Sequence, residues 1–109
     1  MALSPEQVSK IDNTLYNIED IEAEVDESIK RYHGWYPWEE ALVDREFPIE
    51  VRNKVAKRYI KAGWKYVYHN TSSENGERPG LTCFMISNDV ILHCENEKYH
   101  KVTEDKHGV

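Results

Sequence analysis

Apolar residues between Val51 and Ala62 recur every three or four positions, which is the spacing of one buried helix face. The repeat consists of Val51, Val55, Tyr59 and Ala62. Pro48 precedes the repeat, where its missing N–H would be unpaired in any case. Gly63 follows it, where a glycine can take the left-handed conformation that ends a helix. The pattern therefore predicts a helix over residues 49–62.

After Gly63 the side-chain pattern repeats every two residues, which is typical of a strand. Trp64, Tyr66 and Tyr68 share one side of this strand, and Lys65, Val67 and His69 share the other. Residues 70–80 (NTSSENGERPG) are rich in turn formers and predict a polar loop that joins two antiparallel strands.

Two apolar runs follow the loop, at residues 81–87 and 90–94. Asn88-Asp89 between them suits a two-residue hairpin turn. That turn fixes a register in which Ile86 faces Ile91 and Cys83 faces Cys94. Residues 99–102 predict a short edge strand, and we expect residues 103–109 to form a disordered tail.

The N-terminal third has a helix start at Ser4-Pro5 and then a seam of apolar residues at heptad spacing. The seam comprises Val8, Ile11, Leu15, Ile18, Val25 and Ile29. It predicts one helix over residues 5–31, about 40 Å long at ~1.5 Å per residue. The seam folds back on the core of its own domain, or it pairs as a coiled coil with a second copy or with a helix of a partner. With a second copy, Ile11, Leu15, Ile18 and Val25 would make a homo-oligomer.

The segment between this helix and the central helix carries four aromatic residues within residues 32–38. Gly34 closes the first helix, and Pro37 opens a short helix through Val43. The aromatic residues either cap the core or form an exposed anchor for a partner, because Trp and Tyr dominate interface hot spots. These elements predict one α+β domain over residues 1–102. In it a long N-terminal helix, a short helix and a central helix pack on a three- or four-stranded antiparallel meander.

The net charge of −6 is unevenly distributed along the chain. Residues 1–50 contain 13 acidic and 4 basic residues, whereas residues 51–109 contain 7 acidic and 10 basic residues. A partner would contact the acidic face and the aromatic segment through Glu19, Asp20, Glu24, Glu27, Trp35, Tyr36 and Trp38. Phosphates of a nucleic acid would follow the basic face, made by Arg52, Lys54, Lys57, Arg58, Lys61 and Lys65. A small anionic ligand would instead use Arg78 and the polar loop.

Reactive side chains occur without the spacing that catalysis or metal binding needs. Cys83, Cys94 and three histidines, His69, His93 and His100, suggest a zinc site, but the chain has no close Cys-x-x-Cys pair. No Ser or Cys stands in a recognisable nucleophile motif, and Gly76 and Gly80 precede a strand instead of opening a helix. We therefore expect a non-enzymatic protein with no cofactor and no metal.

The location of the protein follows from similar arguments. Two cysteines make no disulfide framework, and the N-terminus lacks the pattern of a signal peptide. No apolar stretch approaches the roughly 20 residues that a bilayer span requires. We expect a cytoplasmic protein with reduced thiols and no membrane partner.

The stretch Val55–Val67 (VAKRYIKAGWKYV) resembles small accessory proteins of tailed bacteriophages, several of which end a basic helix with a Tyr-x-x-Ala-Gly-Trp turn into a strand. With the following loop and strand, the resemblance covers residues 55–86, about a third of the chain. It implies an early phage protein that binds a host protein in the host cytoplasm and modulates or inhibits it. The resemblance supplies no catalytic residues. Nucleic-acid binding and sequestration of an anionic ligand are the alternatives.

Overall fold

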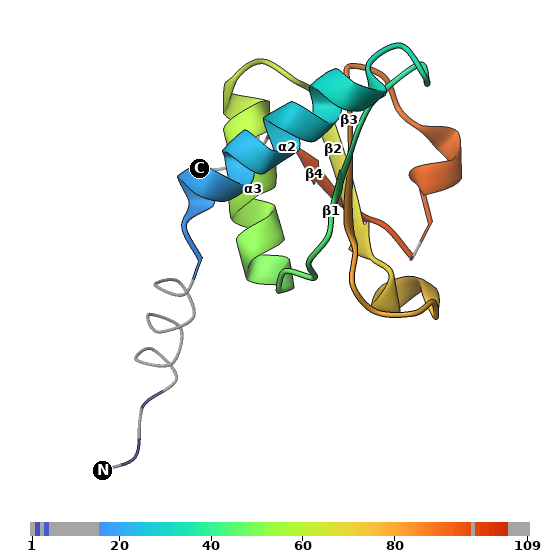
Figure 1. The fold of residues 1–109 in the computed structure, drawn as a ribbon. Helices are drawn as coiled ribbons and strands as arrows, with labels where there is room; N and C mark the ends of the chain where they lie inside the picture. Colours follow the sequence, from blue (N-terminus) through green and yellow to red (C-terminus); the bar gives the residue numbers. More distant parts are fainter. Residues whose placement is uncertain (1, 3, 5–15, 97, 105–109) are drawn as a thin grey trace.

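Helices and strands alternate along the part of the chain that the structure describes. The computed structural model describes residues 2, 4, 16–96 and 98–104. Its helices are α2 (Ile18–Tyr32) and α3 (Ile49–Lys61), and its strands are β1 (Glu39–Val43), β2 (Tyr66–Thr71), β3 (Thr82–Ser87) and β4 (His100–Thr103). Two short 3₁₀ turns, η1 (Ser73–Asn75) and η2 (Leu92–Cys94), follow β2 and β3 (Figure 1). The predicted α+β class is confirmed.

The four strands form one antiparallel sheet in the order β1-β3-β2-β4. The predicted central helix, the strand after it and the short edge strand correspond to α3, β2 and β4. The predicted joining of β2 and β3 by the polar loop is also confirmed. The predicted meander is wrong, because β1 precedes α3 in the chain yet pairs with β3, and β4 returns to pair with β2.

The unit of α3 and β2 forms for the local reasons given above. One face of α3 buries Val51, Val55, Ala56 and Tyr59. Gly63 has a φ of +122°, a backbone conformation that side chains with a Cβ rarely adopt. The reversal at Gly63 therefore directs the chain from the helix into β2 beneath it.

Residues 39–43 form the strand β1, so the predicted short helix through Val43 is wrong. Ala41 and Val43 are buried against the helices, while Leu42 between them lies on the opposite face, which is the alternation of a strand. A five-residue segment with three consecutive apolar residues fits the period of a helix as well as that of a strand. Pairing of β1 with β3 decides the outcome.

Residues 90–94 are not a strand, so the predicted hairpin is wrong as well. β3 lies between β1 and β2 and has no free edge for a third partner. Cys83 stands opposite Leu42 and Asn70 instead of Cys94, and Ile86 stands opposite Glu39 and Val67. After β3 the chain turns over the sheet, where Ile91 and Cys94 are buried.

α2 begins at Ile18, because Asn17 is extended and its Oδ1 accepts a hydrogen bond from Asp20 N at 3.1 Å. This cap contradicts a continuous helix over residues 5–31, of which residues 5–15 lie outside the described residues. Of the predicted seam, Val25 is fully buried, and Ile18 and Ile29 pack against the same core. This part of the seam folds back on its own domain.

Both faces of the sheet are covered (Figure 1). The helices cover one face around Val55, Val67, Phe84 and Ile86. The segment after β3, which includes η2, covers the other face around Tyr68, Met85, Ile91 and Cys94. No helix among the described residues is long and apolar enough to cross a membrane.

Helix α2 also protects the outer edge of β1. Ser28 Oγ accepts a hydrogen bond from Leu42 N at 2.8 Å, so a strand N–H that points away from β3 has a partner. We expect Ser28→Ala to lower the free energy of unfolding by about 1 kcal/mol, because the half-buried N–H loses its acceptor. Urea denaturation measures the change. Lys30→Ala, at an exposed position of the same helix, is the control and should change it by less than about 0.5 kcal/mol. Equal stability of the two variants would contradict the expectation.

Candidate functional site

The aromatic segment, residues 35–38, lies between α2 and β1 and is largely exposed. Trp35 is 68 % exposed and Tyr36 is 41 % exposed. The Tyr36 ring stacks on Trp38 with centroids 5.2 Å apart, and Trp38 in turn lies 5.0 Å from the ring of His93. The exposed-anchor interpretation therefore fits Trp35 and Tyr36, while Trp38 is half-buried against the cluster of Tyr68, Met85, Ile91 and Cys94.

The segment after β3 brings two further apolar side chains to this surface. Leu92 is 85 % exposed and Val90 is 43 % exposed. Together with the aromatic segment they border a hollow of ≈ 420 Å³, called here the apolar hollow. Its lining consists of Pro37, Trp38, Ser87, Asp89, Val90, Ile91, Leu92 and His93.

Hydrogen bonds from the core hold the backbone of this segment. The hydroxyl of Tyr68, a buried residue of β2, accepts from Ile91 N at 3.3 Å and donates to Glu95 Oε2 at 2.6 Å. Asp89 N donates to Ser87 Oγ at 3.0 Å. Burial, with help from the Glu95 carboxylate, raises the pKa of Tyr68 to about 12, so its hydroxyl keeps the proton that it donates. The Leu92 side chain is thus presented to solvent by a fixed backbone.

The electrostatic character of this surface is acidic. Trp38 Nε1 donates to Glu40 Oε1 at 3.2 Å. The charge of the same carboxylate raises the pKa of Tyr36. Asp89 lines the apolar hollow, and none of the described residues that line it is a lysine or an arginine. A bound group at this place would contact apolar surface and carboxylates together.

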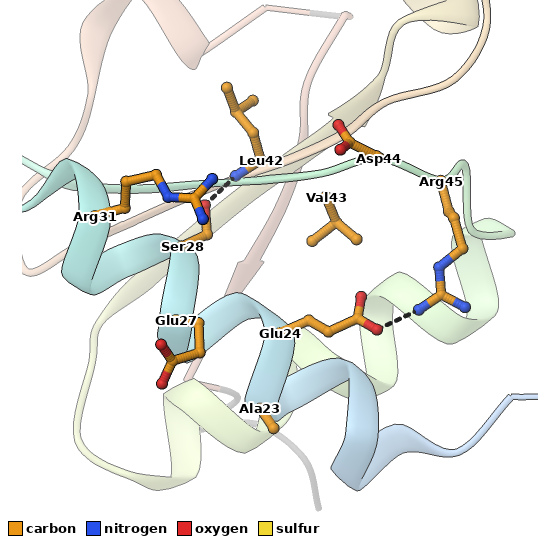
Figure 2. Close-up of a pocket in the computed structure, with 9 residues that line it drawn as sticks. All are labelled: Ala23, Glu24, Glu27, Ser28, Arg31, Leu42, Val43, Asp44 and Arg45. Carbon is orange, nitrogen blue, oxygen red and sulfur yellow. Dashed lines mark hydrogen bonds and ion pairs between the residues drawn. The ribbon is translucent and has the colours of Figure 1, made fainter.

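A second concavity, the edge groove, lies between α2 and β1 (Figure 2). It has a volume of ≈ 420 Å³. It is lined by Ala23, Glu24, Glu27, Ser28, Arg31, Leu42, Val43, Asp44 and Arg45. Figure 2 shows Glu24 reaching across to Arg45, and Arg45 Nη2 lies 2.7 Å from Glu24 Oε1. Its charged groups have both signs and two of them already pair, so the edge groove favours no particular ligand.

A buried polar network links α3, β2, η1 and β4. Arg52 is only 4 % exposed; it donates to Phe47 O at 2.9 Å and to Glu74 Oε1 at 2.7 Å. His69 is fully buried, with Nε2 2.8 Å from Asn53 Oδ1 and Nδ1 3.1 Å from Arg52 Nη1. Because Asn53 Oδ1 can only accept, His69 carries its hydrogen on Nε2 and accepts from Arg52.

Burial and neighbouring charged groups shift the pKa values of His69 and Glu74 in this polar network. Burial, and next the Arg52 charge, lowers the pKa of His69 to about 3. Burial would raise the pKa of Glu74, but hydrogen bonds from Arg52 and His100 outweigh it and hold the pKa at about 2. His100 Nε2 lies 2.7 Å from Glu74 Oε2, and its ring stacks on His69 at 5.2 Å. These residues line neither concavity, so we interpret the polar network as structural.

The predicted acidic face is divided by the fold. Glu19 and Asp20 are exposed in the first turn of α2, while Glu24 and Glu27 line the edge groove. Of the four residues predicted for self-association, Ile11 and Leu15 lie outside the described residues. Val25 is enclosed by its own domain and Ile18 packs against the same core, so Val25 offers no surface to a second copy.

The predicted basic face loses two of its six members. Arg52 points inward to the polar network, and Arg58 forms an ion pair with Glu22 of α2. Lys54, Lys57, Lys61 and Lys65 are exposed. Arg78, the predicted anion-binding residue, is exposed in the loop before β3 and lines neither concavity.

The cysteines behave as apolar packing groups, with Cys94 buried and Cys83 half-buried. Burial raises the pKa of Cys83 to about 12 and that of Cys94 to about 11, so both stay protonated at neutral pH. Cys94 Sγ lies 3.3 Å from Met85 Sδ. Within the described ranges, no group of three His, Cys, Asp or Glu side chains is arranged to hold a metal ion.

Sequence reasoning missed Asp89, Val90 and Leu92, because the hairpin prediction placed residues 90–94 inside a sheet. No local signal set the run Val90-Ile91-Leu92 apart, because the strands β1 and β3 also contain three or more consecutive apolar residues. Comparison of the chain with protein-family models, curated proteins and solved structures finds no match in any of the three.

Proposed function

We propose that this chain is a non-enzymatic protein that binds and modulates another protein through the apolar hollow and the aromatic segment beside it. The observation that carries the proposal is the exposure of Trp35, Tyr36, Val90 and Leu92. Two of these residues border a hollow with Trp38 in its wall. Large apolar side chains gathered on a surface mark interaction sites, and Trp and Tyr are enriched among residues that dominate binding energy.

The rigidity of the backbone supports the same proposal. Tyr68 ties the segment that bears Leu92 to the core through its bonds with Ile91 and Glu95. An anchor that is already ordered loses less conformational entropy on binding than a mobile one. The exposed leucine is therefore suited to insertion into a partner.

The resemblance to phage accessory proteins implies a host protein as the partner, and inhibition or redirection as the effect. Self-association stays a prediction for Ile11 and Leu15. Nucleic-acid binding remains the alternative and would use the exposed side chains of Lys54, Lys57, Lys61 and Lys65, since Arg52 is buried and Arg58 pairs with Glu22. Sequestration of an anion by Arg78 is a further alternative.

A pull-down from bacterial lysate with leucine variants tests this proposal. Tagged wild-type protein, Leu92→Asp and Leu81→Asp are incubated with lysate, with and without nuclease treatment, and bound proteins are identified by mass spectrometry. We expect a host protein to be retained by the wild type and by Leu81→Asp, whose leucine is exposed elsewhere, and to be lost with Leu92→Asp. For the purified pair we expect Leu92→Ala to weaken binding at least about tenfold, or ~1.4 kcal/mol.

Two outcomes would contradict the proposal. A partner retained equally by both aspartate variants would place binding elsewhere on the chain. Enrichment that disappears with nuclease would favour the lysine face, whose affinity must then fall steeply with salt. Circular dichroism melting of both variants checks that they are folded.

A further inference from the structure

We infer that the apolar hollow receives an arginine side chain of the partner, flanked in that partner by apolar residues. The inference rests on the proposed function, because it specifies the chemistry of what that surface binds. It is carried by the combination of an apolar wall and an unneutralised carboxylate in one concavity.

The charge of the apolar hollow selects a cation. Asp89 lines it and makes no ion pair with any residue in the described part of the chain. Glu40 Oε1 accepts a hydrogen bond from Trp38 Nε1, and Trp38 lines the hollow. Because neither lysine nor arginine is among the described residues that line the hollow, an acidic side chain would meet the like charge of Asp89 there. The net charge of −6 adds attraction for a basic segment.

The shape and lining of the apolar hollow favour arginine over lysine. Pro37, Val90 and Leu92 offer apolar surface to the aliphatic stem of a long side chain, which leaves its charged head for Asp89. A guanidinium is planar and weakly hydrated, so it loses less than an ammonium on contact with an aromatic wall such as Trp38. The volume of ≈ 420 Å³ lies within the range of about 300–1,000 Å³ typical of ligand sites.

Nuclear magnetic resonance with two short peptides tests the inference. The probes are acetylated and amidated leucine–arginine–leucine and the same peptide with citrulline, which keeps the shape of arginine without its charge. The reporters are the Trp38 indole N–H, assigned with Trp38→Phe, and the backbone amides of residues 89–93. At pH 8 we expect the arginine peptide to shift these signals saturably, with an affinity about fivefold higher than that of the citrulline peptide.

Carboxylate variants identify the group that is responsible. Asp89→Asn should remove the preference for arginine over citrulline. Asp44→Asn, which removes a carboxylate from the edge groove instead, should leave the preference unchanged. Equal affinities for the two peptides, an unchanged preference in Asp89→Asn, or no saturable shift of these signals would each overturn the inference.

The outcome is separable from that of the proposed function. Capture of a protein that depends on Leu92, together with indifference to the peptide charge, would end the arginine inference and leave the interaction surface in place. Selective arginine binding without any Leu92-dependent capture would support the arginine site and remove the proposal of a protein partner in that lysate.

Discussion

Arg52→Ala is expected to lower the free energy of unfolding by about 3 kcal/mol, the low end of the range for breaking a buried ion pair. The substitution removes the donors to Phe47 O and Glu74 Oε1 and to Nδ1 of the fully buried His69. Three elements, α3, β2 and η1, lose their common contact. We take the low end because Glu74 is about one-third exposed and can be solvated once Arg52 is gone.

Urea denaturation of three variants measures this effect and separates its causes. Lys57→Ala is the matched control, an exposed cation on the same helix, and should change stability by less than about 0.5 kcal/mol. Arg52→Met keeps most of the buried stem and should be destabilised nearly as much as Arg52→Ala, because the lost groups are the donors. A loss below about 1 kcal/mol for Arg52→Ala would show that the polar network contributes little to the fold.

The inward position of Arg52 illustrates where sequence reasoning fails in this chain. The helix itself was predictable, because its apolar repeat, Pro48 and Gly63 are local signals. The helix face assigned to Arg52 was wrong, because its partners His69 and Glu74 come from later segments. The period-two pattern did place His69 on one side of its strand with Val67, and both are buried.

The sheet order depended on information that no local pattern contains. Residues 81–87 and 90–94 are both apolar, and the turn residues between them favour a hairpin. Pairing of β3 with β1 on one side and β2 on the other leaves residues 90–94 without an edge. The short segment Glu39–Val43 was the missing strand, and its sequence fits a helix turn equally well.

Part of the candidate surface was predictable, because the aromatic residues form a local signal in the sequence. Four aromatic residues within seven indicated an anchor or a cap, and the structure divides them between the two roles, with Trp35 exposed and Trp38 half-buried. Leu92 and Asp89 reach the same place only because the segment after β3 folds over the sheet. Their contribution follows from tertiary structure alone.

The free energy of unfolding is expected to fall by about 3 kcal/mol between pH 7 and pH 4 because of His69. Its folded-state pKa is about 3, below the ordinary value of 6.5, so the unfolded chain binds a proton in this window that the folded chain excludes. The stability that His69 contributes is therefore present above pH 6.5 and lost as the pH falls toward 3. Arg52 on α3, Glu74 at η1 and His100 on β4 are the charged or titratable groups that face it.

Glu74 adds a second loss of the same sign at lower pH. Its folded-state pKa of about 2 lies below the ordinary value of 4.5, so its contribution is lost as the pH falls from 4.5 toward 2.

Urea denaturation at intervals between pH 7 and pH 4.5 isolates the histidine. His69→Gln retains a donor and an acceptor without a titrating ring, and we expect its stability to be nearly independent of pH over this range, whatever its value at pH 7. His93→Gln, at an exposed position, should keep the wild-type slope. A wild-type slope in His69→Gln would assign the acid sensitivity to other groups and contradict the burial of a neutral His69 as its cause.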